Sequence, residues 1–244
     1  MKELKGHASL IVGASRGIGR AIAEELITQG ARVAFTYHSS DEAAKEIVKM
    51  ASKNGTEAFP IQADARDIDS LRQMLTDANE RLGGLDSLVF VTAGKIISKP
   101  TADMTLEEYD GMFDVVRGTY FALQKSLQYL NRNGSIVCFS TGGTKMAMPT
   151  QGAYTGAKAA IERFCLSLSK EAGEKGIRVN LIAPGVTKTD GLTIDKDMIE
   201  QLKQQTPLGR LGETEDIAPV VAFLISDKAR WINGQIIGVN GGIL

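Results

Sequence analysis

The sequence predicts a single domain of the α/β class, in which helices cover both faces of a parallel β-sheet. Short apolar, β-branched runs alternate with longer amphipathic segments, and the short runs are apolar on both faces, as in buried parallel strands. A glycine-rich turn follows the first run and opens the first helical segment. With 244 residues and neither repeats nor a Pro/Ser-rich linker, the chain is expected to form one unit over residues 1–244.

Seven segments have the length and composition of strands. In order they are ASLIVGA (8–14), ARVAFTY (31–37), EAFPIQA (57–63), DSLVFVTA (86–93), GSIVCFS (134–140), IRVNLIAP (177–184) and GQIIGVNG (234–241).

Between the strands, helical periodicity predicts helices over residues 18–29, 41–53, 67–82, 105–130, 153–174 and 213–226. SSDE and TLEE fit the capping-box pattern at helix starts, and the glycines of QGAR, LGGLD and EKGIR fit helix ends. Residues 187–212 have the composition of a loop, and a long insertion near the end of a compact fold predicts a substrate lid.

Composition excludes several classes of function. The formal net charge is −1 with scattered Lys and Arg, so no basic face for a nucleic acid is expected. Apolar runs fall short of the roughly 20 residues of a membrane helix, and the first residues lack the pattern of a signal peptide, which predicts a cytoplasmic protein without membrane partners. Cys138 and Cys165 are expected to be buried reduced thiols, and no metal site is expected.

The turn IVGASRGIG places glycines at positions 13, 17 and 19 between the first strand and the first helix. Such glycines let the backbone approach a pyrophosphate, which the free N–H groups of the helix N-terminus can bind. A tight strand-to-helix turn without a ligand is the alternative.

The residues after the second and third strands bear on the cofactor. FTYHSS lacks the acidic residue that would bind a free ribose 2′-hydroxyl, whereas Arg16, His38 and Ser39 offer a cation and polar donors, which favours NADP over NAD. Asp64, just after the third strand, is placed to accept from the adenine amino group, or it caps the following helix.

Tyr154 and Lys158 are four residues apart in GAYTGAK, so they project from the same face of a helix. An ammonium near a phenol favours the phenolate, so the pair can serve as a tunable proton donor. A solvated Tyr–Lys pair on a helix surface is the alternative.

In combination, GASRGIG (13–19), TAG (92–94), YTGAK (154–158), APGVTKT (183–189) and INGQIIGVNGG closely resemble the compact branch of the short-chain dehydrogenase/reductase family. The resemblance covers roughly residues 5–242 and is nearest to 3-oxoacyl-[acyl-carrier-protein] reductase-like members.

This resemblance implies a Rossmann-type, doubly wound sheet of seven strands. It also implies that Tyr154 is the general acid/base and that Lys158 lowers the pKa of the phenol and holds the nicotinamide ribose. The family serine that bonds the substrate oxygen corresponds to Thr141, thirteen residues before Tyr154, with Ser140 as the substitute. The cofactor-binding residues implied are Gly13, Ser15, Arg16, Gly17, Ile18, Gly19, His38, Ser39, Asp64, Ala65, Ala93, Gly94, Tyr154, Lys158, Pro184, Gly185, Thr187 and Thr189.

Two family motifs are altered. NNAG is VTAG here, and the asparagine of NLxG, which holds a relay water, is replaced by Val115 in VVRG. Another group then resupplies the proton to Lys158, or turnover is slow, or the chemistry has changed.

The expected function is an NADPH-dependent carbonyl reductase that acts on a ketone, with a 3-oxoacyl thioester, free or carrier-protein-bound, as the implied substrate class. The alternatives are a secondary-alcohol dehydrogenase and an NADP-binding regulatory or scaffold subunit. A homotetramer is also expected, because family members pair the helices that correspond to 105–130 and 153–174, where Phe121, Ala122, Phe164 and Leu168 are the candidate interface residues.

Overall fold

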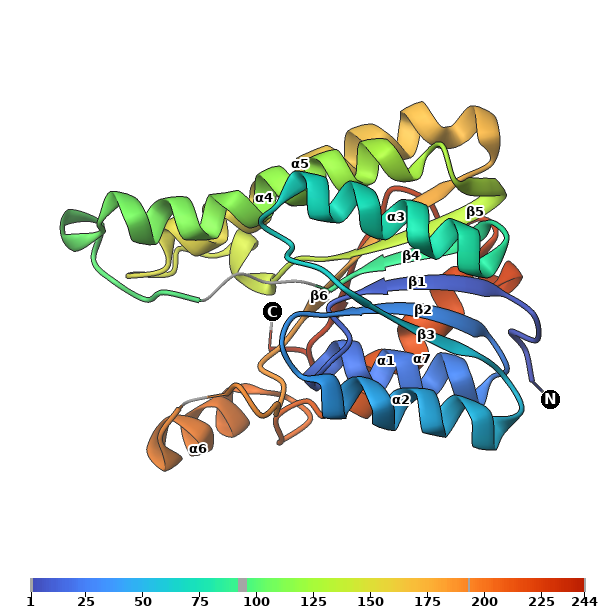
Figure 1. The fold of residues 1–244 in the computed structure, drawn as a ribbon. Helices are drawn as coiled ribbons and strands as arrows, with labels where there is room; N and C mark the ends of the chain where they lie inside the picture. Colours follow the sequence, from blue (N-terminus) through green and yellow to red (C-terminus); the bar gives the residue numbers. More distant parts are fainter. Residues whose placement is uncertain (1, 92–95, 193, 244) are drawn as a thin grey trace.

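A seven-stranded sheet organises the chain in the computed structural model, which describes residues 2–91, 96–192 and 194–243 (Figure 1). All neighbouring strands are parallel, in the order β3-β2-β1-β4-β5-β6-β7. The strands are β1 (Ala8–Val12), β2 (Arg32–Tyr37), β3 (Ala58–Gln62), β4 (Leu85–Phe90), β5 (Leu130–Phe139), β6 (Arg178–Pro184) and β7 (Ile236–Val239). The strand order reverses between β1 and β4, which is where open α/β sheets bind ligands.

Helices cover both faces of this sheet (Figure 1). One apolar core lies under α3 (Ile68–Leu82), α4 (Leu106–Ser126) and α5 (Gly152–Glu171), with Leu75, Leu123 and Ile161 buried in it. The other lies under α1 (Gly17–Thr28), α2 (Asp41–Asn54) and α7 (Thr214–Ile225). The strands are therefore buried on both sides, as their two-faced apolarity predicted.

All seven predicted strands are confirmed, but the fourth predicted helix was too long. Helix α4 ends at Ser126, and Leu130 instead begins β5, where it pairs with Leu85 of β4. Leu130 continues the helical spacing of Leu123 and Leu127, so periodicity alone could not separate the helix from the strand.

The prediction that residues 187–212 form only a loop was also wrong. Helix α6 (Lys196–Gln205) lies within this segment, and the side chain of Asp195 accepts a hydrogen bond from the backbone N–H of Met198 at its start. In Figure 1 this helix stands away from the sheet, and none of its residues is buried. Met198, Ile199 and Leu202 do have helical spacing, but the loop-like composition of the surrounding segment concealed it.

The two predicted capping boxes had different outcomes. Thr105 and Glu108 form one at the start of α4, as TLEE predicted. SSDE does not form one, because the side chain of Ser40 makes no capping hydrogen bond at the start of α2.

Both cysteines are buried and unpaired, as expected. Among the helices in the described ranges, none combines the length and the apolarity needed to cross a membrane.

A polar row, buried at Ser9 and Ser87 and partly buried at His7, lies toward the amino ends of the strands, away from the glycine turn. His7 Nε2 is 3.1 Å from the hydroxyl of Ser87, which is 2.9 Å from the hydroxyl of Ser9. Burial lowers the pKa of His7 below its ordinary value, and this outweighs the opposing effect of Asp86. The folded state therefore holds His7 as a neutral imidazole.

Because the folded pKa of His7 lies below the unfolded value of 6.5, protonation favours unfolding. The contribution of neutral His7 to the free energy of unfolding is fully present above pH 6.5 and is lost as the pH falls below it. We expect urea unfolding to show a larger loss of stability between pH 7.5 and pH 5.5 for the parent chain than for His7→Gln. Equal losses in both chains would contradict this account.

Candidate active site

The loops at the carboxyl ends of the strands carry the predicted site residues. Because every strand runs in the same direction, the turns after β1, β2, β3, β5 and β6 meet at one edge of the sheet. Of the predicted residues, Ala93 and Gly94 lie outside the described residues.

The glycine turn after β1 has a backbone that only glycine suits. Gly13 and Gly17 have φ values of +93° and +53°, in the left-handed region. A Cβ on Gly19 would lie 2.0 Å from the carbonyl oxygen of Gly13, so any side chain there would force the turn apart. The turn is fastened to β2, because Gly13 N–H donates to the Thr36 hydroxyl at 2.8 Å.

The start of α1 suits an anion. Arg16 occupies the N-cap without a side-chain hydrogen bond to the helix, and no acidic residue lies in the first turn. The free backbone N–H groups and the positive end of the helix dipole are therefore available to a phosphate. Thr189, from the loop after β6, lies beside Gly17, 3.3 Å from the position that a Cβ would take. These two loops form a cradle that fits the pyrophosphate of a dinucleotide.

His38 and Ser39 are exposed after β2, close to this cradle in the sheet order, and Arg16 is exposed at its mouth. Within the described part of the chain, Arg16 forms no ion pair, in contrast to its neighbour Arg20, which pairs with Glu24 and Glu46. A cation and polar groups at this place fit a 2′-phosphate better than a free 2′-hydroxyl.

Asp64 does not cap the following helix, because Asp67 is the N-cap of α3. Arg66 instead donates to both carboxylate oxygens of Asp64, at 3.0 and 2.7 Å. This hydrogen bonding to Arg66 lowers the pKa of Asp64 to about 2. Ala65 lies against α4, since a Cβ on Gly118 would be 2.1 Å from the Ala65 carbonyl oxygen. An adenine amino group would share the Asp64 carboxylate with Arg66.

After β6, Thr187 is buried and its hydroxyl donates to the Gly185 carbonyl at 3.0 Å. Gly185 packs against Asn240, and Pro184 is the last residue of β6. The loop that follows β6 therefore brings Thr189 back to the glycine turn, where it lies beside Gly17.

Lys158 is buried in α5, and its ammonium donates to the carbonyl oxygen of Phe139, the last residue of β5, at 3.0 Å. Burial lowers the pKa of Lys158 to about 8. Tyr154, one turn earlier, has a raised pKa because of burial, while a hydrogen bond with the Thr141 side chain opposes this rise. The expected lowering of the phenol pKa by Lys158 is not found in the protein alone, because the ammonium faces Phe139 instead. Tyr154 is therefore a neutral phenol at pH 7.

Thr141 and Ser140 face different partners. The Thr141 side chain accepts from the backbone N–H of Gly143 at 3.3 Å and acts to lower the pKa of the Tyr154 phenol, whereas the Ser140 hydroxyl donates to the buried carboxylate of Glu162 at 2.5 Å. Of the two alternatives left by the sequence, the geometry favours Thr141 for a role beside the phenol.

Val115 is buried in α4, and its carbonyl oxygen accepts from the Thr119 hydroxyl at 2.7 Å. The carbonyl is therefore already bonded to its own helix. In this chain, neither the side chain nor that carbonyl offers a free polar atom to a relay water.

Sequence reasoning missed Glu162 and Thr144. Glu162 follows Lys158 by four residues, so helical spacing alone could have placed it on the same face as Tyr154 and Lys158. Nothing in the sequence indicated its partners in the segment after β5.

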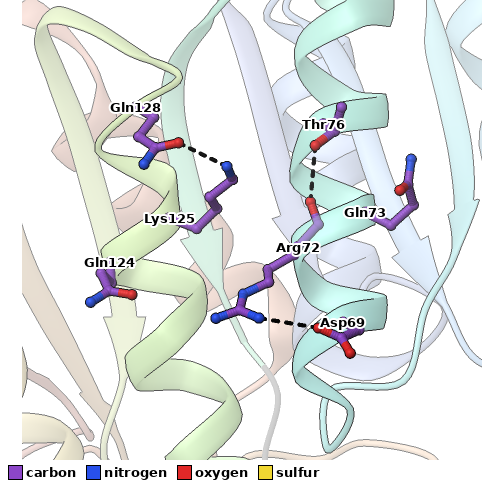
Figure 2. A pocket seen from close by; sticks show the side chains of 7 residues that line it. All are labelled: Asp69, Arg72, Gln73, Thr76, Gln124, Lys125 and Gln128. Atoms are coloured by element: carbon purple, nitrogen blue, oxygen red, sulfur yellow. Dashed lines mark hydrogen bonds and ion pairs between the residues drawn. The ribbon is translucent and has the colours of Figure 1, made fainter.

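A separate recess lies between α3 and α4, lined by Asp69, Arg72, Gln73, Thr76, Gln124, Lys125 and Gln128 (Figure 2). Its charged groups are hydrogen-bonded locally, Arg72 to Asp69 and Lys125 to Gln128. It has no nucleophile beside a base, so the carboxyl edge is the better candidate.

Known proteins resemble this chain over almost its whole length. A family model described as enoyl-(acyl carrier protein) reductase matches residues 13–244. Versicolorin reductase stcU of Emericella nidulans is 38% identical over 254 residues, covering 98% of this chain and 96% of that protein. A short-chain dehydrogenase from Burkholderia cenocepacia J2315, solved with NADP, has 33% identity and a TM-score of 0.93, covering 99% of both chains. The angucycline C-6 ketoreductase LanV, solved with bound NADP, has 36% identity and a TM-score of 0.92, covering 99% of this chain and 97% of that one.

The cradle can be tested without any ligand. We expect Gly19→Ala to lower the melting temperature strongly, because its Cβ would overlap the Gly13 carbonyl. Gly111→Ala in α4 is the matched control, since nothing lies within 4 Å of that Cβ. It should stabilise the chain by roughly 0.5–1 kcal/mol, the usual gain from replacing a helical glycine with alanine. Similar melting temperatures for the two variants would show that the turn has room for a side chain.

Proposed function

The chain belongs to the short-chain dehydrogenase/reductase family of oxidoreductases, and from this membership we propose that it reduces a ketone with NADPH. The observation that carries the proposal is the arrangement of Tyr154, Thr141 and Lys158 at the carboxyl edge of the sheet. A neutral phenol beside a hydroxyl is suited to give a proton to a carbonyl oxygen that is being reduced.

In this proposal the bound cofactor supplies the hydride, and the chain supplies binding, orientation and the proton. Gly13 to Gly19 and the start of α1 hold the pyrophosphate, while Arg16, His38 and Ser39 hold the 2′-phosphate. Thr141 donates to the substrate oxygen and Tyr154 protonates it. Lys158 holds the nicotinamide ribose and is predominantly charged below its pKa of about 8.

We propose that the proton that is resupplied to Lys158 does not travel through the position of Val115. The Val115 carbonyl is occupied by Thr119, so a water held at this point of α4 would compete with an existing hydrogen bond. A lysine whose pKa is lowered to about 8 releases its proton more readily than an ordinary lysine.

We propose an apolar ketone as substrate. Four exposed apolar side chains come from the segments that follow β4, β5 and β6 on the carboxyl side: Ile96, Met146, Met198 and Leu208. The relatives include a protein named as a ketoreductase and another named as a versicolorin reductase, which supports a carbonyl substrate. A 3-oxoacyl thioester, free or carrier-protein-bound, is one member of this class.

We also propose that the chain forms a homotetramer in the cytoplasm, in which α4 and α5 of one subunit pack against those of another. Tyr120, which is 45% exposed, packs edge-on against Phe121 and Phe164 on this surface. Ala122 and Leu168 do not contribute to the surface as the sequence suggested, because both are buried against their own sheet. Light scattering at micromolar concentration would reveal the oligomeric state.

Tyr154→Phe tests the proton donor. We expect kcat for ketone reduction to fall by about 10²-fold or more, the usual contribution of a general acid, with the Kd for NADPH close to the parent value. Tyr109→Phe is the control, because Tyr109 is an exposed tyrosine stacked on Phe113 in α4. NADPH oxidation should be followed with ketones, 3-oxoacyl thioesters and 2-enoyl thioesters. Retention of most activity by Tyr154→Phe would exclude the tyrosine as the acid.

Arg16→Ala tests the choice of cofactor. We expect it to weaken NADPH binding by about tenfold or more, as for loss of a charge-assisted hydrogen bond, while NADH binding changes little. Arg20→Ala, one turn further along α1, is the control and should affect neither cofactor. Equal losses of NADPH and NADH affinity in Arg16→Ala would show that Arg16 does not contact the 2′-phosphate.

A further inference from the structure

Glu162 is a buried carboxylate that the proposed chemistry leaves without a role. Its side chain lies in α5, one turn after Lys158 and two turns after Tyr154, and the residue is only 6% exposed. Burying a carboxylate is costly unless hydrogen bonds compensate for the lost water. The partners of Glu162 therefore indicate what it does.

Both hydrogen-bond partners of Glu162 lie in the segment that follows β5. The Ser140 hydroxyl donates to Oε1 at 2.5 Å, and the Thr144 hydroxyl is 2.8 Å from the same oxygen. The Thr144 hydroxyl is also 3.1 Å from the Thr141 carbonyl oxygen, but its single proton favours the shorter contact with the carboxylate. Ser140 and Thr144 bracket Thr141, the residue whose side chain acts to lower the pKa of Tyr154.

A second connection fixes the other side of this segment. The Lys158 ammonium donates to the carbonyl of Phe139, two residues before Thr141. Helix α5 thus holds the chain at Phe139, at Ser140 and at Thr144, and it carries Tyr154 itself. Thr141 lies between these points, and its own hydroxyl accepts from the backbone N–H of Gly143 at 3.3 Å.

We infer that Glu162 is a positioning residue, which holds Thr141 beside Tyr154 by accepting hydrogen bonds from the hydroxyls of Ser140 and Thr144. The inference rests on the proposed function, in which the Thr141 hydroxyl and the Tyr154 phenol meet at one substrate oxygen. Glu162 touches neither substrate nor cofactor and acts only through the segment that it holds. Small displacements of such groups are known to cost much of the rate.

Glu162→Met removes the acceptor at similar side-chain length, and Glu162→Gln keeps an acceptor oxygen but loses the charge. We expect kcat to fall by roughly 10- to 100-fold in Glu162→Met, with an intermediate value in Glu162→Gln and a KM for NADPH close to that of the parent. The partial rescue by glutamine and the split between kcat and KM would not follow from a general loss of structure.

Glu171→Met is the matched control. Glu171 lies in the same helix and also accepts from a serine hydroxyl, that of Ser167 at 2.8 Å, but this pair is exposed. The control should keep the parent kcat. If folded Glu162→Met and Glu162→Gln also keep it, the inference is overturned.

If Glu162→Met does not fold, Ser140→Ala and Thr144→Val decide the question, because each deletes one of the two hydrogen bonds with little change of volume. Lower kcat at unchanged KM for NADPH in both supports the inference, and parent values in both overturn it.

A ligand-free readout separates this inference from the proposed function. That readout is the hydrogen exchange of the backbone amides of residues 140–144. Exchange that is faster in Glu162→Met, but not in Glu171→Met, supports the positioning role even if the parent reduces no ketone. If Glu162→Met does not fold, the same increase is expected in both Ser140→Ala and Thr144→Val. Unchanged exchange there overturns it.

Discussion

The hydrogen bond from the buried ammonium of Lys158 to the carbonyl of Phe139 is the interaction on which the arrangement of the candidate site depends. It joins helix α5 to the last residue of β5, so the helix cannot shift along the sheet without leaving a buried amine unpaired. An unpaired buried charge is far more costly than an ordinary lost hydrogen bond. Tyr154, one turn before Lys158, is thereby held above the end of β5, where Thr141 lies.

The burial of both side chains explains the protonation states of the pair. Burial disfavours the charged form of each group, so the pKa of Lys158 is lowered to about 8 and that of Tyr154 is raised. The phenol keeps its proton at neutral pH, as a donor in a reduction must. The glycine turn at the start of α1 lies on the other side of the strand-order reversal, so a dinucleotide bound there could extend across the edge of the sheet toward this phenol.

Much of this could be predicted from sequence, for physical reasons that differ between elements. The strands are apolar on both faces, and the Tyr154–Lys158 face follows directly from helical spacing. Helix α6 was missed although Met198, Ile199 and Leu202 have helical spacing, because the segment around it has the composition of a loop and the helix buries none of its residues. The partners of Glu162 and the carbonyl acceptor of Lys158 come from another element of the fold, and only the tertiary structure brings them together.

If the phenol of Tyr154 and a nicotinamide meet at a carbonyl, an isotope label on the cofactor should reach the carbonyl carbon. An apolar ketone or 3-oxoacyl thioester should be reduced with NADPH carrying deuterium at the transferable C4 position, and the product analysed by mass spectrometry and NMR. We expect one deuterium on the carbon that bore the carbonyl, with the hydroxyl proton drawn from water. Reduction of a 2-enoyl thioester instead, with the deuterium on a carbon of the former double bond, or no transfer to any ketone, would contradict this expectation.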